Sequence, residues 1–297
     1  MIDLKKMQAG DYGLQNFALF TSLERAEGKP FEYCMGLLDT FYTEMEAHSD
    51  MIGIVRSYRD IEDNWRKGRM SALLTIEEGG VCQGSLRFLR DFYRLGVRMM
   101  TLTWNFPNEL GFPNKRERRE DGTTYLVPDQ SNGLTGTGIE FVEEMERLGM
   151  IIDVSHLNDA GIWDVFRHTK KPFVASHSNA RAVASHPRNM TDDMIRELAD
   201  RGGVMGINYY TCFLRDFCQD EAPVSRVSYM VEHMKHIRNV GGIGCLGLGS
   251  DFDGIECELE MKDASMVPML ADAMKREGFS QSEIEAVFYK NVLRVYR

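Results

Sequence analysis

The feature of this sequence that most restricts its fold is a repeated alternation of short apolar runs with longer amphipathic stretches. The apolar runs are bounded by Gly, Pro or polar residues, and the stretches between them have helical periodicity. This pattern is typical of β-α units, which assemble into a parallel sheet covered by helices. The predicted strands are Leu14–Phe20, Ser71–Ile76, Arg98–Thr103, Met150–Val154, Pro172–Ser176, Gly203–Ile207 and Cys245–Gly249.

The segments between these strands are expected to be helical. Two of them begin with recognisable caps, Thr191 in one case and Ser280 with Glu283 in the other. The predicted helices are Phe31–Ala47, Ser85–Leu95, Gly138–Leu148, Asp159–Arg167, Asp192–Ala199 and Val224–Val240, with two more inside Ser265–Tyr289.

Two α/β architectures fit this order of elements. A closed (β/α)₈ TIM barrel needs eight strands, one more than the runs provide. An open doubly wound sheet could hold seven, but its first strand usually leads into a glycine-rich phosphate loop. Leu14–Phe20 is followed instead by Thr21-Ser22-Leu23-Glu24. We therefore favour the barrel, with its first strand apparently missing.

Length and composition limit the class of protein. A chain of 297 residues with 43% hydrophobic residues can bury a full core, and no linker-like tract divides it, so we expect one domain over residues 1–297. The apolar runs are far shorter than the roughly 20 residues that cross a bilayer. Since no export signal follows Met1 and no anchor ends the chain, we expect a cytoplasmic protein without a membrane partner.

Charge and cysteine usage point the same way. A net charge of −10 argues against nucleic-acid binding, which requires clustered Lys and Arg. The basic segment from Lys115 to Arg119 is interrupted by Glu117 and followed by acids, so we interpret it as a solvated loop. The 6 cysteines contain no C-x-x-C pair and are expected to be reduced thiols.

Polar residues follow four of the predicted strands at the point where each strand ends. In a parallel barrel these ends share one rim, where active sites form. Singly, each segment could be a structural histidine, a turn or a polar loop. Together, two histidines and several carboxylates have the composition of a hydrolytic zinc site. The segments are Glu77-Glu78-Gly79-Gly80, Ser155-His156, His177-Ser178-Asn179 and Ser250-Asp251-Phe252-Asp253-Gly254.

These segments belong to a longer set of blocks that resembles the zinc-dependent membrane dipeptidases, the renal-type family M19. The resemblance covers essentially the whole chain, and the order of the blocks makes it more specific than any single short motif. The blocks are Ser71–Glu77, Leu95–Thr103, Asp153–His156, Ser176–Ala180, Arg188-Asn189 and Gly247–Gly254.

The resemblance implies an amidohydrolase-like barrel with two zinc ions. Glu77 would bridge the ions, and His156 and His177 would complete the shell of the second. Glu77 is preferred to Glu78 because the blocks then align without an insertion. Arg188 would bind the terminal carboxylate of the substrate, a task that suits a planar guanidinium. Asp251 would shuttle the proton.

The activity implied is hydrolysis of dipeptides by metal-activated water, with Asp251 taking the proton of the water and returning it to the leaving amine. Dipeptides are then the expected partners, and a homodimer is a further expectation. One alternative is another metal-dependent barrel hydrolase, acting on lactones, phosphotriesters or N-acyl amino acids. The other is a catalytically impaired homologue or a binding protein.

Two departures from the family pattern support that last alternative. The family's first strand ends in a His-x-Asp pair that binds the first zinc, and this chain has no His before His48. We expect either a start codon assigned too far downstream or a truncated gene, and at most about one zinc in the chain as it stands. Trp104 also occupies the place of a family histidine, for which Asn105 is a candidate substitute. His186, near Arg188, is a candidate pocket residue.

Overall fold

The computed structural model describes residues 1–216 and 223–297, which form two compact units. The Glu77 unit consists of Gly13–Lys115, Pro128–Lys171 and Tyr296–Arg297. The His177 unit consists of Met1–Tyr12, Arg116–Val127 and the described part of Pro172–Val295. Each unit has its own parallel strands and its own helices.

The Glu77 unit is organised around β3 (Met70–Glu77), in which every residue except the last is buried. β1 (Leu14–Phe20) pairs with β3 along its whole length, and β4 (Met99–Thr101) pairs with the end of β3. β7 (Ile151–Asp153) pairs with β4 in turn, and all of these pairings are parallel. The register aligns Glu77 with Thr101 and Thr101 with Asp153, so that these strands end at one edge.

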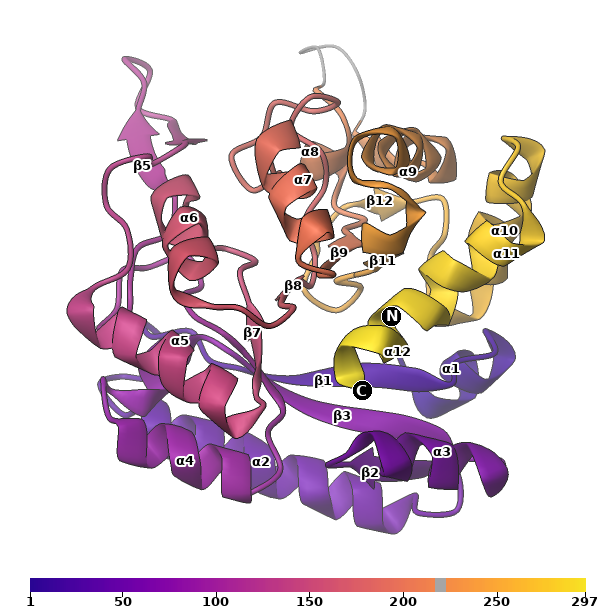
Figure 1. The fold of residues 1–297 in the computed structure, drawn as a ribbon, viewed down its shortest axis with the longest axis horizontal. Coiled ribbons are helices and arrows are strands. Elements are labelled where there is room, and N and C mark those ends of the chain that lie inside the picture. Colours follow the sequence, from indigo (N-terminus) through magenta and orange to yellow (C-terminus); the bar gives the residue numbers. More distant parts are fainter. Residues whose placement is uncertain (217–222) are drawn as a thin grey trace. The chain divides into compact units, whose positions relative to one another are not determined.

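Helices cover this sheet because both faces of a parallel sheet must be buried. The buried residues Cys34, Leu38, Phe41 and Met45 of α2 recur at helical spacing. In Figure 1, α2 and α4 run along one side of β1 and β3. The helices of the unit are α2 (Pro30–Ala47), α3 (Tyr58–Arg66), α4 (Leu86–Arg94), α5 (Gly136–Leu148) and α6 (Asp159–His168), with a 3₁₀ turn at Gly79–Cys82.

The His177 unit contains three further parallel strands. β9 (Val204–Ile207) pairs with both β8 (Val174–Ala175) and β11 (Leu246–Leu248). Two short strands, β10 (Val224–Ser225) and β12 (Glu258–Leu259), pair separately. The helices are α1 (Leu4–Ala9), α7 (Asp192–Asp200), α8 (Thr211–Leu214), α9 (Val227–Gly241), α10 (Pro268–Arg276), α11 (Gln281–Glu285) and α12 (Asn291–Tyr296), with 3₁₀ turns at Ile243–Cys245 and Ala264–Met266 and a π turn at Ala286–Lys290.

All of the predicted strands are present, within a few residues of the expected bounds. The predicted helices are present too, and both predicted caps are formed. The prediction missed β2 (Ile52–Val55), which pairs with the first half of β3. Gly53 interrupts the short apolar run of β2. Glycine is required there because the Asn64 side chain occupies the space that a Cβ would fill, and this side chain donates a hydrogen bond to the Gly53 carbonyl.

The interpretation of Lys115–Arg119 as a loop is wrong. β5 (Lys115–Arg118) pairs with β6 (Thr124–Val127), although the side chains of β5 are all exposed as expected. Tyr125 explains the pairing, since its hydroxyl donates to Glu117 and its ring lies 4.7 Å from the Arg119 guanidinium. The predicted helix Val224–Val240 also begins later, at Val227, because Val224–Ser225 is a strand.

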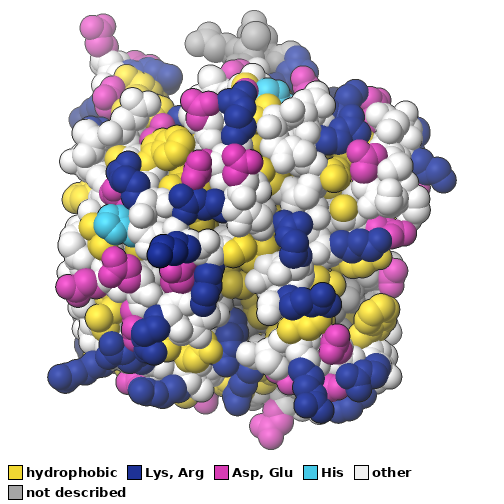
Figure 2. Space-filling view, in the orientation of Figure 1, with side chains coloured by type: hydrophobic (Ala, Val, Ile, Leu, Met, Phe, Trp, Pro, Cys, Tyr) yellow, Lys and Arg dark blue, Asp and Glu magenta, His cyan; other side chains and the backbone are white. Residues whose placement is uncertain are grey.

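Other sequence-based expectations concern the surface and the thiols. On the face shown in Figure 2, Lys and Arg side chains are interspersed with Asp and Glu. Every cysteine that the structure describes is a free thiol, and Cys218 lies outside the described residues. Among the helices of residues 1–216 and 223–297, none has both the length and the apolar character needed to span a membrane.

Candidate metal centre

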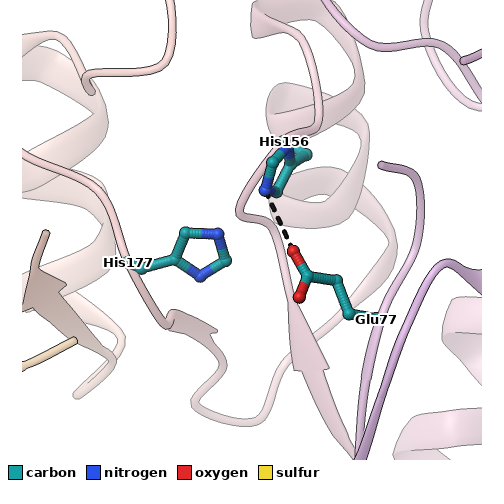
Figure 3. Close-up of side chains that lie close together, drawn as sticks. All are labelled: Glu77, His156 and His177. Carbon is teal, nitrogen blue, oxygen red and sulfur yellow. Dashed lines mark ion pairs between the residues drawn. The ribbon is translucent and has the colours of Figure 1, made fainter. Parts of the chain in front are cut away.

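Glu77 and His156 meet at the carboxyl edge of the Glu77 unit. Glu77 is the last residue of β3, and His156 follows β7. Oε1 of Glu77 lies 3.1 Å from Nε2 of His156, the contact marked by the dashed line in Figure 3. Both side chains are largely buried, with exposed fractions of 18% and 10%. The structure therefore brings together two of the predicted metal ligands.

The turn after β7 holds His156 in an unusual backbone conformation. Asp153 accepts hydrogen bonds from the Ser155 amide, at 3.0 Å, and from the Thr101 hydroxyl, at 2.8 Å. His156 then adopts a left-handed conformation with φ of 71°. Such a conformation costs a residue with a side chain about 1–3 kcal/mol and is concentrated at functional sites. The hydrogen bonds of Asp153 therefore brace the turn that carries this strained backbone.

The environment of Glu78 differs from that of Glu77. The Glu78 side chain is fully buried and accepts hydrogen bonds from the backbone amides of Gly80 and Trp104 and from the Asn108 side chain. Burial raises the pKa of Glu78 to about 7, against the effect of these donors. Glu78 thus organises the loops around it, which favours Glu77 as the metal ligand.

His177 belongs to the His177 unit, where it follows β8. Its Nδ1 lies 2.7 Å from the Ser176 hydroxyl, which makes Nε2 its candidate ligand atom. The ends of β9 and β11 pack tightly against this segment. A Cβ on Gly206 or Gly249 would lie 2.1 or 1.9 Å from the Ser176 carbonyl oxygen, so that only glycine fits at either position.

Asp251 follows β11 in the same unit and has a left-handed backbone, with φ of 57°. Its Oδ2 accepts a hydrogen bond of 3.0 Å from the side-chain amide of Asn208, a fully buried residue. The Asn208 backbone amide donates in turn to Asn179, at 2.9 Å. The sequence analysis missed Asn208, although a polar residue directly after the predicted strand Gly203–Ile207 was an available signal.

Arg188 is buried, with only 6% of its surface exposed. Its guanidinium donates to the Ser178 hydroxyl at 3.4 Å and to the His177 carbonyl at 3.3 Å, and it lies over the Phe213 ring. His186 supports this arrangement, because its Nδ1 accepts from the Arg188 amide. Burial lowers the pKa of His186 to about 4, which keeps the ring neutral.

The geometry of the Glu77–His156 pair fits a metal ion. Zinc binds carboxylate oxygen and imidazole nitrogen at about 2.0–2.2 Å, so two ligands of one tetrahedral ion lie about 3.4 Å apart. The observed separation of 3.1 Å is close to that value. A buried oxygen and nitrogen facing each other are also the donor types that zinc prefers.

Comparison with known proteins identifies the family. The family model described as membrane dipeptidase (peptidase family M19) matches residues 1–297. The chain belongs to the membrane dipeptidase family. An uncharacterized protein encoded in the pqqA 5' region of Klebsiella pneumoniae is 35% identical, over 86% of this chain and 92% of its own. An uncharacterized dipeptidase of Schizosaccharomyces pombe is 32% identical, over 99% of this chain and 71% of its own.

Solved structures of metallopeptidases share the fold. The crystal structure of dipeptidase AC, a metallopeptidase of family M19, is 26% identical and has a TM-score of 0.87, covering 99% of this chain and 88% of its own. The structure of a Rhodobacter sphaeroides metallopeptidase liganded with a phosphinate mimic of L-Ala-D-Ala is 24% identical and has a TM-score of 0.87, covering 99% of this chain and 89% of its own. The first of these supports both family and fold, and the second supports the fold. The predicted resemblance and the predicted α/β barrel class are confirmed.

Proposed function

We propose that this membrane dipeptidase family member is a zinc-dependent enzyme that hydrolyses dipeptides. We further propose that it works as one cytoplasmic domain over residues 1–297, without a nucleic-acid or membrane partner. The observation that carries the zinc dependence is the Glu77–His156 pair, whose donor atoms are separated as two ligands of one ion would be. The family match over the whole chain supports the dipeptide substrate.

His177 is the proposed third ligand of this ion. It follows a parallel strand as His156 does, and the contact between its Nδ1 and Ser176 directs ligation to Nε2. A zinc ion bound by such a set lowers the pKa of water and polarises the peptide carbonyl. Glu77, His156 and His177 would hold the ion, and the remaining steps fall to other side chains.

Arg188 is proposed to bind the C-terminal carboxylate of the dipeptide. Its burial and its contacts with Ser178, His177 and Phe213 fix the plane of the guanidinium in advance, which reduces the entropy lost on binding. This requirement for a free carboxylate near the scissile bond would restrict substrates to very short peptides. It also separates this proposal from hydrolysis of lactones or phosphotriesters.

Asp251 is proposed as the general base and acid. Its carboxylate would accept the proton of the attacking water and return it to the leaving amine. Asn208 orients this group through a hydrogen bond to Oδ2. Since an amide donor stabilises the charged form, Asn208 also keeps Asp251 ready to accept a proton.

A catalytically impaired homologue is the second candidate, and Trp104 is the observation that favours it. Trp104 packs against Phe20, with ring centroids 4.8 Å apart, and against Phe106, at 5.8 Å. It stands where the resemblance places a histidine that contacts the reacting carbonyl. An indole can donate one hydrogen bond but cannot accept or exchange a proton as an imidazole does.

Zinc analysis combined with a substrate panel tests the proposal. The purified chain would be depleted with a chelator, reloaded with zinc, and assayed on L-L and L-D dipeptides, a lactone, a phosphotriester and an N-acyl amino acid. We expect zinc-dependent hydrolysis of dipeptides that is lost on depletion and restored on reloading. Zinc binding without dipeptide hydrolysis would support the impaired homologue, and preferential turnover of another substrate would support a different barrel hydrolase.

A further inference from the structure

The side chain of Asn105 contacts the candidate ligand His156 on the side away from Glu77. Oδ1 of Asn105 lies 3.1 Å from Nδ1 of His156, while Nε2 of the same ring faces Glu77. We infer that Asn105 is a positioning residue for the metal site, which holds His156 in the tautomer and the orientation that zinc requires. This inference rests on the proposed zinc-binding function.

The chemistry of the amide oxygen decides the tautomer. A carbonyl oxygen can only accept a hydrogen bond, so Nδ1 of His156 must carry the hydrogen in this contact. A neutral imidazole with hydrogen on Nδ1 has its lone pair on Nε2, the atom that lies beside Glu77. In known metal sites, a ligating histidine usually donates its second N–H to a carboxylate or carbonyl, and Asn105 supplies the carbonyl here.

The loop that carries Asn105 is anchored next to Glu77. The backbone amide of Trp104 donates to Glu78 at 3.1 Å, and the Asn108 side chain donates to Glu78 and to the Leu102 carbonyl. Oδ1 of Asn108 also accepts from the Leu110 amide at 2.7 Å. Because Glu78 directly follows Glu77, this network ties the position of Asn105 to the position of the other ligand.

The Trp104 ring is a further neighbour of the His156 ring. The Trp104 ring is 6.2 Å away and tilted by 46°, a packing contact that does not distinguish the two ring nitrogens. Unlike this packing contact, the Asn105 side chain bonds one particular ring nitrogen, Nδ1.

Zinc affinity of three variants tests this role. Asn105→Ala removes the acceptor, Asn105→Asp keeps an acceptor, and Asn132→Ala is the matched control, since it removes an asparagine hydrogen bond to Asp129 elsewhere in the Glu77 unit. Zinc dissociation constants would be measured by competition with a chromogenic chelator. We expect Asn105→Ala to weaken zinc binding by about 10–100-fold. Asn132→Ala should bind zinc as tightly as the wild type, and Asn105→Asp should bind it at least as tightly.

A second readout follows the imidazole without metal. In zinc-free protein with ¹⁵N-labelled histidine, the Nδ1 of His156 should be protonated in the wild type and in Asn105→Asp, and should show a mixture of tautomers in Asn105→Ala. The resonance is assigned from its loss in His156→Gln. This readout also holds if Asn105→Ala lowers stability, provided that the melting temperature shows that it is folded.

The outcomes separate the inference from the function on which it rests. Wild-type affinity in Asn105→Ala, or equal weakening in Asn105→Ala and Asn105→Asp, would overturn the positioning role. A wild-type chain that binds no zinc would instead contradict the proposed function. The NMR measurement alone would then decide the positioning role, and an unchanged His156 tautomer in Asn105→Ala would overturn it.

Discussion

The side-chain amide of Asn208 donates a hydrogen bond of 3.0 Å to Oδ2 of Asp251. We expect Asn208→Leu, which cannot donate, to lower kcat for dipeptides by about 10–100-fold, part of the contribution of general acid-base catalysis. Asn208→Asp adds a like charge beside Asp251 and should raise the pKa of that carboxyl, because two adjacent carboxylates disfavour ionisation of both. The acidic limb of the kcat/KM profile should then move to higher pH. An unchanged pH profile and kcat in both variants, at normal zinc content, would refute this coupling.

Arg188→Lys should raise KM for dipeptides by about 10-fold or more, because an ammonium cannot form two parallel hydrogen bonds with a carboxylate. For a dipeptide amide, which has no terminal carboxylate, the wild type and Arg188→Lys should have the same kcat/KM. Arg215→Lys is the matched control, since Arg215 lies over Tyr229 in the same unit. Steady-state kinetics that are the same for Arg188→Lys and the wild type would remove Arg188 from substrate binding.

The zinc content of the chain should be at most about one tightly held ion per molecule. Glu77 and His156 of the Glu77 unit, with His177 as the third proposed ligand, are the side chains proposed to hold one ion. We expect His156→Ala and His177→Ala each to lower zinc per chain, measured by elemental analysis after dialysis. His168→Ala, a histidine of α6, should retain the wild-type content. Two tightly bound ions in the wild type would show that other residues complete a second site.

Glu144 of α5 should make stability depend on pH. Its carboxylate accepts hydrogen bonds from Arg147 and from Arg90 of α4. The two bonds from Arg147, together with the one from Arg90, lower the pKa of Glu144 from 4.5 to about 2. Between these two pH values the unfolded chain binds more protons than the folded chain. The contribution of Glu144 to the free energy of unfolding is therefore complete above about pH 4.5 and is lost as the pH falls toward 2.

The test is Glu144→Gln. Because both arginines are partly exposed, we expect the variant to be less stable by about 1–2 kcal/mol at pH 7. The difference from the wild type should shrink as the pH falls, in denaturant titrations at a series of pH values. Glu143→Gln, which changes a neighbouring exposed carboxylate, should show little effect. A difference that stays constant with pH would contradict the assigned pKa.

The sequence predicted the parts of this molecule that depend on apolar runs and their ends. β3 was predictable because it is buried almost throughout. Glu77, His156, His177 and Asp251 could be proposed as site residues because they lie where such strands end. β2 was missed because Gly53 interrupts its apolar run. Glycine is needed there because of a contact with the Asn64 side chain, which periodicity in the sequence cannot show.

Side-chain contacts between loops were equally beyond the sequence. Trp104 and Asn105 were noticed only as departures from a family pattern, whereas the role inferred for Asn105 depends on where its amide lies relative to one ring nitrogen. The distinct environments of Glu77 and Glu78 likewise depend on donors from other loops. The roles of the individual site residues stay predictions until they are measured.

The left-handed backbone of His156 has a consequence for protein engineering. Glycine adopts this conformation without penalty, so His156→Gly would release local strain even as it removes the imidazole. A library screened only for heat resistance would therefore tend to enrich that change and discard the proposed ligand. Thermostable variants of this chain should be selected with zinc retention as a second criterion, because at position 156 thermal stability and metal binding favour different amino acids.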